Sequence, residues 1–234
     1  MRTIGGQGDI MWVKICGVRT PEQAEMVCEY QPDAIGLNFY EPSPRCVSNT
    51  TAQHIAAVCV GKAELVGVFV DHSPMEIENI VRSVGLDRIQ CHGNESPAAL
   101  REIQKRCPDA SLIRAWRMRP EGLSDLANYL AECHAADVHL SAVLIDAYVA
   151  GTYGGSGKTV AWEQLTQEYQ TGDWPSLILA GGLRPDNVAE AIEAVQPWGI
   201  DTASGVEYLE GEKGVKDPER VAQFITSARQ ADES

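Results

Sequence analysis

Two glycine turns, each placed directly after a short apolar run, are the segments of this sequence best suited to bind an anion. The apolar run 177–180 leads into Gly181 and Gly182, and a second turn at Ser204 and Gly205 follows the next apolar stretch. Glycine has no Cβ, so backbone N–H groups can approach a ligand, and a helix N-terminus nearby favours negative charge. The two turns therefore predict a phosphate clamp.

Cys16 and Asp146 are the candidate proton-transfer groups, because each closes a short apolar run. An isolated cysteine is often a small buried hydrophobe, whereas a thiolate base or nucleophile requires a pKa depressed by nearby cations or helix N-termini. A carboxylate ending a buried strand is costly unless it is paired or solvated, so Asp146 is either a structural cap or a general acid or base. Facing each other, the two would form an acid and base pair.

Arg45 and His92 are weaker candidates for binding. Pro42 and Pro44 stiffen the loop that carries Arg45, which favours a positioned guanidinium for a carboxylate; a plain surface arginine is the alternative. His92 ends an expected strand, where a hydrogen-bonded structural histidine is commoner than a catalyst. The other histidines lack metal-ligand spacing, and we expect no metal site.

The glycine-rich segment 154–159 resembles a nucleotide-binding loop but lacks its spacing. The Walker pattern needs a glycine five residues before Gly157, and that position is Thr152. A loop that covers a bound ligand, with Lys158 as an anion contact, and a flexible linker are both compatible with this composition.

Eight strand-like runs alternate with eight helical patterns along the chain. Parallel strands with right-handed crossovers follow from this alternation, and eight units close a barrel, so we expect an α/β fold, a single-domain (β/α)8 TIM barrel with its active site at the carboxyl ends of the strands. A doubly wound open sheet is the alternative. The expected strands are 13–16, 34–39, 65–70, 88–91, 112–116, 142–146, 177–180 and 199–202, and the expected helices begin near Pro21, Asn49, Pro74, Ser96, Leu123, Trp162, Asp186 and Pro218.

Composition limits the class of protein and its partners. The chain has 234 residues and a formal net charge of -14, which disfavours nucleic acid and anionic membranes as partners, and its apolar runs are too short to span a bilayer. Seven cysteines without CxxC spacing indicate reduced thiols and a cytoplasmic location. We expect a flexible extension at 1–10, the barrel at 11–229 and a frayed tail at 230–234.

At the candidate site residues and in the segments around them, the sequence resembles the phosphoribosylanthranilate isomerase family. The resemblance runs in order from Val13 to about Ile225 through Lys14-Ile15-Cys16-Gly17, Ser43-Pro44-Arg45, His92-Gly93, Gly155-Ser156-Gly157-Lys158-Thr159, Leu179-Ala180-Gly181-Gly182-Leu183 and Ser204-Gly205-Val206-Glu207. It implies a cofactor-free Amadori rearrangement of N-(5-phosphoribosyl)anthranilate, a small phosphosugar, to its 1-deoxyribulose 5-phosphate isomer.

The resemblance also implies roles. Asp146 would protonate the ring oxygen, Cys16 would remove the C2 proton, Arg45 would bind the anthranilate carboxylate, and His92 would belong to the substrate-binding set. Gly181, Gly182, Ser204 and Gly205 would hold the phosphate. The family usually has Asp at Asn94 and Phe-Asp-Trp at 160–162, and the loop at 208–213 is longer than usual.

Two rival interpretations remain open at this stage. A histidine-pathway isomerase barrel would need a second glycine clamp after the third or fourth strand, where this chain has Val70-Asp71-His72 and Cys91-His92-Gly93. A barrel that serves only as a binding subunit would not need Cys16, Asp146 and Arg45. A monomer and a homodimer are equally compatible with the sequence.

Overall fold

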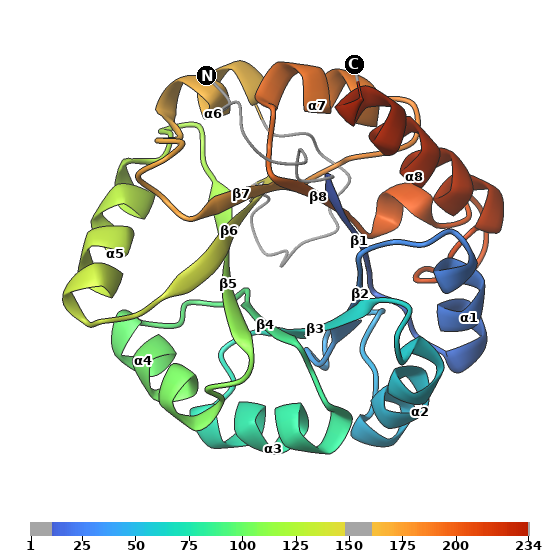
Figure 1. Cartoon of the computed structure of the whole chain (residues 1–234), viewed down its shortest axis with the longest axis horizontal. Helices are drawn as coiled ribbons and strands as arrows, with labels where there is room; N and C mark the ends of the chain where they lie inside the picture. Colours follow the sequence, from blue (N-terminus) through green and yellow to red (C-terminus); the bar gives the residue numbers. More distant parts are fainter. Residues whose placement is uncertain (1–10, 148–160, 234) are drawn as a thin grey trace.

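The computed structural model describes residues 11–147 and 161–233, which form a closed barrel of eight parallel strands in the order β1 to β8 (Figure 1). The expected (β/α)8 barrel is confirmed, and the open sheet is excluded because β1 pairs with β8. The strands are β1 Trp12–Cys16, β2 Ala34–Asn38, β3 Glu64–Phe69, β4 Arg88–Cys91, β5 Ser111–Met118, β6 Leu140–Ala147, β7 Ser176–Leu179 and β8 Gly199–Thr202.

A ring of helices surrounds the barrel (Figure 1). The helices are α1 Pro21–Glu29, α2 Asn49–Cys59, α3 Pro74–Val84, α4 Pro97–Arg106, α5 Ser124–Ala135, α6 Trp162–Glu168, α7 Val188–Val195 and α8 Pro218–Asp232, with a short 3-10 helix, η1, at Ser204–Val206. Among them, α1, α3, α4 and α8 begin with a proline after a side chain that caps the helix. Proline fits the first helical position because no intrahelical partner exists there for its missing N–H.

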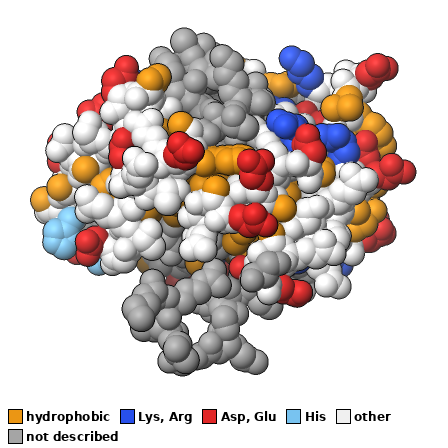
Figure 2. Space-filling model, turned by 90° about the horizontal axis from the view of Figure 1, so that it is seen from above, with side chains coloured by type: hydrophobic (Ala, Val, Ile, Leu, Met, Phe, Trp, Pro, Cys, Tyr) orange, Lys and Arg blue, Asp and Glu red, His pale blue; other side chains and the backbone are white. Residues whose placement is uncertain are grey.

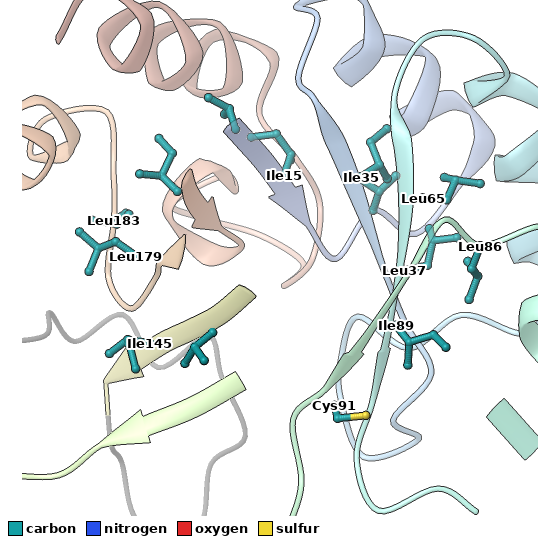
Figure 3. Packing of buried hydrophobic residues seen from close by; sticks show 14 of the residues in the cluster. Ile15, Ile35, Leu37, Leu65, Leu86, Ile89, Cys91, Ile145, Leu179 and Leu183 are labelled. Atoms are coloured by element: carbon teal, nitrogen blue, oxygen red, sulfur yellow. The ribbon is translucent and has the colours of Figure 1, made fainter. Parts of the chain in front are cut away.

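Two apolar layers stabilise the barrel. The larger one fills the space between strands and helices, and Figure 3 shows part of it, with Ile15, Ile35 and Ile89 on three of the strands. The smaller one fills the barrel interior and includes Trp12, Val66 and other inward residues. Alternate residues of each strand therefore face opposite layers, which decides which polar side chains point into the barrel.

The two ends of the described chain meet at the amino-terminal side of the barrel. The backbone N–H of Met11 donates to Asp232 Oδ2 at 2.8 Å, and Arg229 Nη2 donates to Asp33 Oδ2 at 2.7 Å. The last helix thus continues to Asp232, beyond the boundary expected at 229, because it is held against the start of β1. The extension expected at 1–10 lies outside the described residues.

The surface is predominantly acidic, as the composition predicts. Figure 2 shows one side of the molecule, where Asp and Glu side chains are scattered and Lys and Arg gather in one region. No helix in the described ranges is long and apolar enough to cross a membrane.

Candidate functional site

The barrel interior carries polar side chains at the carboxyl ends of β1, β4 and β6. Trp12 belongs to the inner apolar layer, so the alternation of β1 directs Lys14 and Cys16 inward as well. On β6, Leu144 belongs to the same layer, and Asp146 follows it by two residues. The structure therefore directs both predicted proton-transfer groups into one barrel mouth.

The first glycine turn has a backbone that only glycine adopts readily. Gly181 and Gly182 have φ angles of 82° and 68°, in the left-handed region that disfavours a Cβ. Asn187 lies at the N-cap position of α7, but its side chain makes no capping hydrogen bond to the helix. Instead, Asn187 Nδ2 donates to the carbonyl of Gly182 at 3.1 Å, and its Oδ1 accepts from the N–H of Arg184 at 2.7 Å. The side chain braces the glycine turn.

The second turn packs tightly against the first. A Cβ at Gly205 would lie 1.8 Å from the carbonyl oxygen of Leu183 and 2.6 Å from Thr202 Oγ1, so no larger residue fits there. Arg220 Nη2 donates to the carbonyl of Gly205 at 2.8 Å. The carbonyl is therefore directed toward α8, and a cation lies beside the turn.

A small cavity joins the two turns to the predicted general acid. Its volume is about 30 Å³. It is lined by Asp146, Ala180, Gly181, Gly182, Leu183, Asp201, Thr202, Ala203, Ser204 and Gly205. All four residues predicted for the phosphate clamp thus share one cavity with Asp146.

Cys16 lies in a buried, charged environment. Lys14, fully buried, donates from Nζ to Asp201 Oδ1 at 2.7 Å. Two cations lie near the thiol, Lys14 and Lys216, and both act to lower its pKa, while Asp201 opposes them. Burial is the largest effect, and the pKa of the Cys16 thiol lies above its usual range, contrary to the depressed value expected for a resting thiolate.

His92 lies close to Asp146 and is neutral at physiological pH. Its Nε2 is 3.7 Å from Asp146 Oδ2. Burial, followed by the charges of Arg114, Lys14 and Arg117, lowers the pKa of His92 to about 3 and outweighs the nearby carboxylate. Within the described ranges Nε2 has no hydrogen-bond partner, although it is buried. This nitrogen is therefore available to a bound molecule.

Arg45 forms an ion pair with Glu207, which lies far from it in the sequence. Its Nε donates to Glu207 Oε1 at 2.6 Å and its Nη2 to Glu207 Oε2 at 3.0 Å. Lys216 Nζ also donates to Glu207 Oε1 at 3.1 Å, and both Glu207 and Lys216 are buried. Burial lowers the pKa of Lys216 to about 8, although the Glu207 carboxylate acts to raise it. Burial acts to raise the pKa of Glu207, but Arg45 and Lys216 hold it below its usual range.

Four charged residues of this site had no assigned role at the level of sequence: Lys14, Asp201, Glu207 and Lys216. A signal existed for Lys14, because a lysine two residues before Cys16 in a buried strand must share its inward face. Glu207 and Lys216 belong to separate segments, and only the antiparallel bridge between them reveals their contact.

The segment 154–159, with Lys158 as a predicted anion contact, lies outside the described residues. In the part of the chain that the structure describes, no group of three or more His, Cys, Asp or Glu side chains has the arrangement of a metal site.

Over most of its length the chain is similar to phosphoribosylanthranilate isomerases. A family model described as N-(5'phosphoribosyl)anthranilate (PRA) isomerase matches residues 13–227. An N-(5'-phosphoribosyl)anthranilate isomerase of Trichlorobacter lovleyi is 37% identical over 219 residues, which are 94% of this chain and 98% of that relative.

Solved structures of phosphoribosylanthranilate isomerases have the same fold. One, from Thermotoga maritima, has a TM-score of 0.80 at 32% identity and covers 94% of this chain and 100% of its own. A second, in complex with reduced 1-(o-carboxyphenylamino)-1-deoxyribulose 5-phosphate, has a TM-score of 0.77 at 29% identity, with the same coverage. From the match over residues 13–227 and the identity to these proteins, this chain belongs to the N-(5'-phosphoribosyl)anthranilate isomerase family.

Proposed function

We propose that this isomerase of tryptophan biosynthesis uses Asp146 as its general acid and Cys16 as its general base in the Amadori rearrangement of N-(5-phosphoribosyl)anthranilate. The cavity that places Asp146 beside both glycine turns is the observation that carries the assignment. A phosphosugar anchored at the turns by its phosphate would present its ring to the carboxyl group. The site is thus suited to open a sugar ring next to a bound phosphate.

The proton transfers follow from the two environments. Asp146 gives a proton to the furanose ring oxygen, the bond from that oxygen to C1 breaks, and a protonated Schiff base forms. Cys16 then removes the C2 proton, and the electrons of the C–H bond neutralise the iminium to give an enolamine, which tautomerises to the ketone. The Cys16 thiol is protonated before substrate binds. The positive charge of the Schiff base then favours the thiolate of Cys16 when the C2 proton is removed.

Arg45 is suited to the anthranilate carboxylate. Glu207 accepts hydrogen bonds from Nε and Nη2, which fixes the plane of the guanidinium and leaves Nη1 for a second anion. The neutral ring of His92 offers Nε2 beside Asp146, where it can orient a hydroxyl group of the sugar. Gly181, Gly182, Ser204 and Gly205 bind the phosphate in this proposal.

A single-phosphate substrate fits better than one with two phosphates. The turn after β4 is filled by its own contacts: Glu95 accepts from the N–H groups of Gly93 and Asp71, and Asn94 N donates to Asp71 Oδ1. These N–H groups are therefore not available to a second phosphate. A Thermotoga maritima relative is described as dimeric, and we propose a monomer or homodimer for this chain in a cytoplasmic setting.

The test is the decay of anthranilate fluorescence with freshly generated phosphoribosylanthranilate, corrected for spontaneous hydrolysis. Asp146→Asn and Cys16→Ala should each lower turnover by orders of magnitude while substrate still binds. Near-normal turnover in either variant would refute its role. Arg45→Ala should mainly weaken binding, and an unchanged affinity would refute the carboxylate contact.

A further inference from the structure

Lys14 and Asp201 form an ion pair inside the barrel, directly below Cys16. The two residues are partners in the register of β1 and β8, and Nζ lies 2.7 Å from Oδ1, with side chains 0% and 10% exposed. Removing two charges from water costs free energy that their attraction often fails to recover. A pair in this position is therefore poorly explained by stability alone, and its neighbours indicate what else it does.

The end of the lysine side chain and the thiol lie beside the same point of β2. Gly36 pairs with Cys16 in the sheet, and a Cβ on Gly36 would lie 2.7 Å from Cys16 Sγ and 3.0 Å from Lys14 Cε. Because position 36 has no side chain, both groups extend over it. The lysine ammonium and the sulfur are therefore neighbours, with no side chain of β2 between them.

We infer that Lys14 is a positioning residue for the isomerisation: its ammonium, held in place by Asp201, stabilises the thiolate of Cys16 when that sulfur acts as the base. This inference rests on the proposed role of Cys16. The ammonium does not contact the substrate. It acts through the thiol by favouring the anionic form.

The charged groups facing the thiol come from three elements. Lys14 of β1 and Lys216, just before α8, favour the thiolate, and Asp201 of β8 disfavours it. Lys216 is also committed to Glu207 and to the carbonyl of Ala203, at 3.1 and 2.8 Å. Asp201 keeps Lys14 protonated despite complete burial, since it raises the pKa of that ammonium above the usual value. Of the two cations near the sulfur, Lys14 has its pKa raised above the usual value, whereas the pKa of Lys216 is lowered to about 8.

The test compares Lys14→Met, which has a similar shape and no charge, with the double variant Lys14→Met/Asp201→Asn, which leaves no unpaired carboxylate. Lys105→Met, on the exposed surface of α4, is the matched control. Alkylation of Cys16 by iodoacetamide is followed by peptide mass spectrometry across pH, without substrate. Lys14→Met should shift the alkylation profile upward by about one pH unit, which is about tenfold less thiolate at pH 7. The double variant should shift it upward by less, because it also removes the Asp201 charge that disfavours the thiolate.

The ascending limb of the kcat profile, in which the thiolate forms as pH rises, should shift upward in the same way, and in Lys14→Met kcat at pH 7 should fall about tenfold with little change in KM. The control should match the wild type in both measurements. An unchanged alkylation profile in folded variants would overturn the inference, and so would failure of both variants to fold, which would assign the pair to barrel stability. A wild type without isomerase activity would instead refute the proposed function, while the alkylation profile would still report on Lys14.

Discussion

The buried, neutral His92 should make the protein lose stability in mild acid. Burial, with Arg114, Lys14 and Arg117, lowers its pKa from 6.5 to about 3. Between these values the unfolded chain binds a proton that the folded chain does not, so the free energy of unfolding decreases as pH falls. The slope is about 1.4 kcal/mol per pH unit, and the loss between pH 7.5 and pH 4.5 is roughly 3 kcal/mol.

His92→Gln removes the titration and keeps a polar side chain. Urea unfolding followed by tryptophan fluorescence at pH 7.5, 6.5, 5.5 and 4.5 measures the free energy of unfolding of wild type and variant. The wild type should lose roughly 3 kcal/mol more than His92→Gln over this range. His54→Gln, on the exposed side of α2, should follow the wild type. Parallel curves for wild type and His92→Gln would refute the argument, because other groups titrate equally in both.

Two further substitutions test the turns around the site. Gly205→Ala should lower the free energy of unfolding by about 1–3 kcal/mol and raise KM, because its Cβ would collide with the carbonyl of Leu183. A normal Tm together with a normal KM would contradict this tight packing. Glu95→Gln should lower the free energy of unfolding in urea by about 3–5 kcal/mol, because it leaves the buried Arg114 without its ion-pair partner. The control Glu102→Gln, whose partner Arg106 is more exposed, should lower it by less than about 1 kcal/mol. Equal losses in the two variants would contradict the difference in burial.

The fold was predictable because its signals are local. Short apolar runs alternate with amphipathic patterns, so the eight strands lie within a few residues of the expected ranges. The helix α7 begins at Val188, close to the expected Asp186, but the Asn187 side chain bonds to the turn at Gly182 and leaves the helix end uncapped by a side chain. A side chain with two possible partners cannot be assigned from its position in the chain.

The sequence alone determined the barrel, the family and the residue types that end the strands, since periodicity and motif order are properties of the chain itself. Only the tertiary structure decided the ionisation and pairing of those residues. Cys16 is held protonated at rest by burial, and Arg45 is paired with Glu207, which lies far from it in the sequence. Both outcomes depend on the local loss of water and on charges from other strands, and these exist only when the barrel is closed.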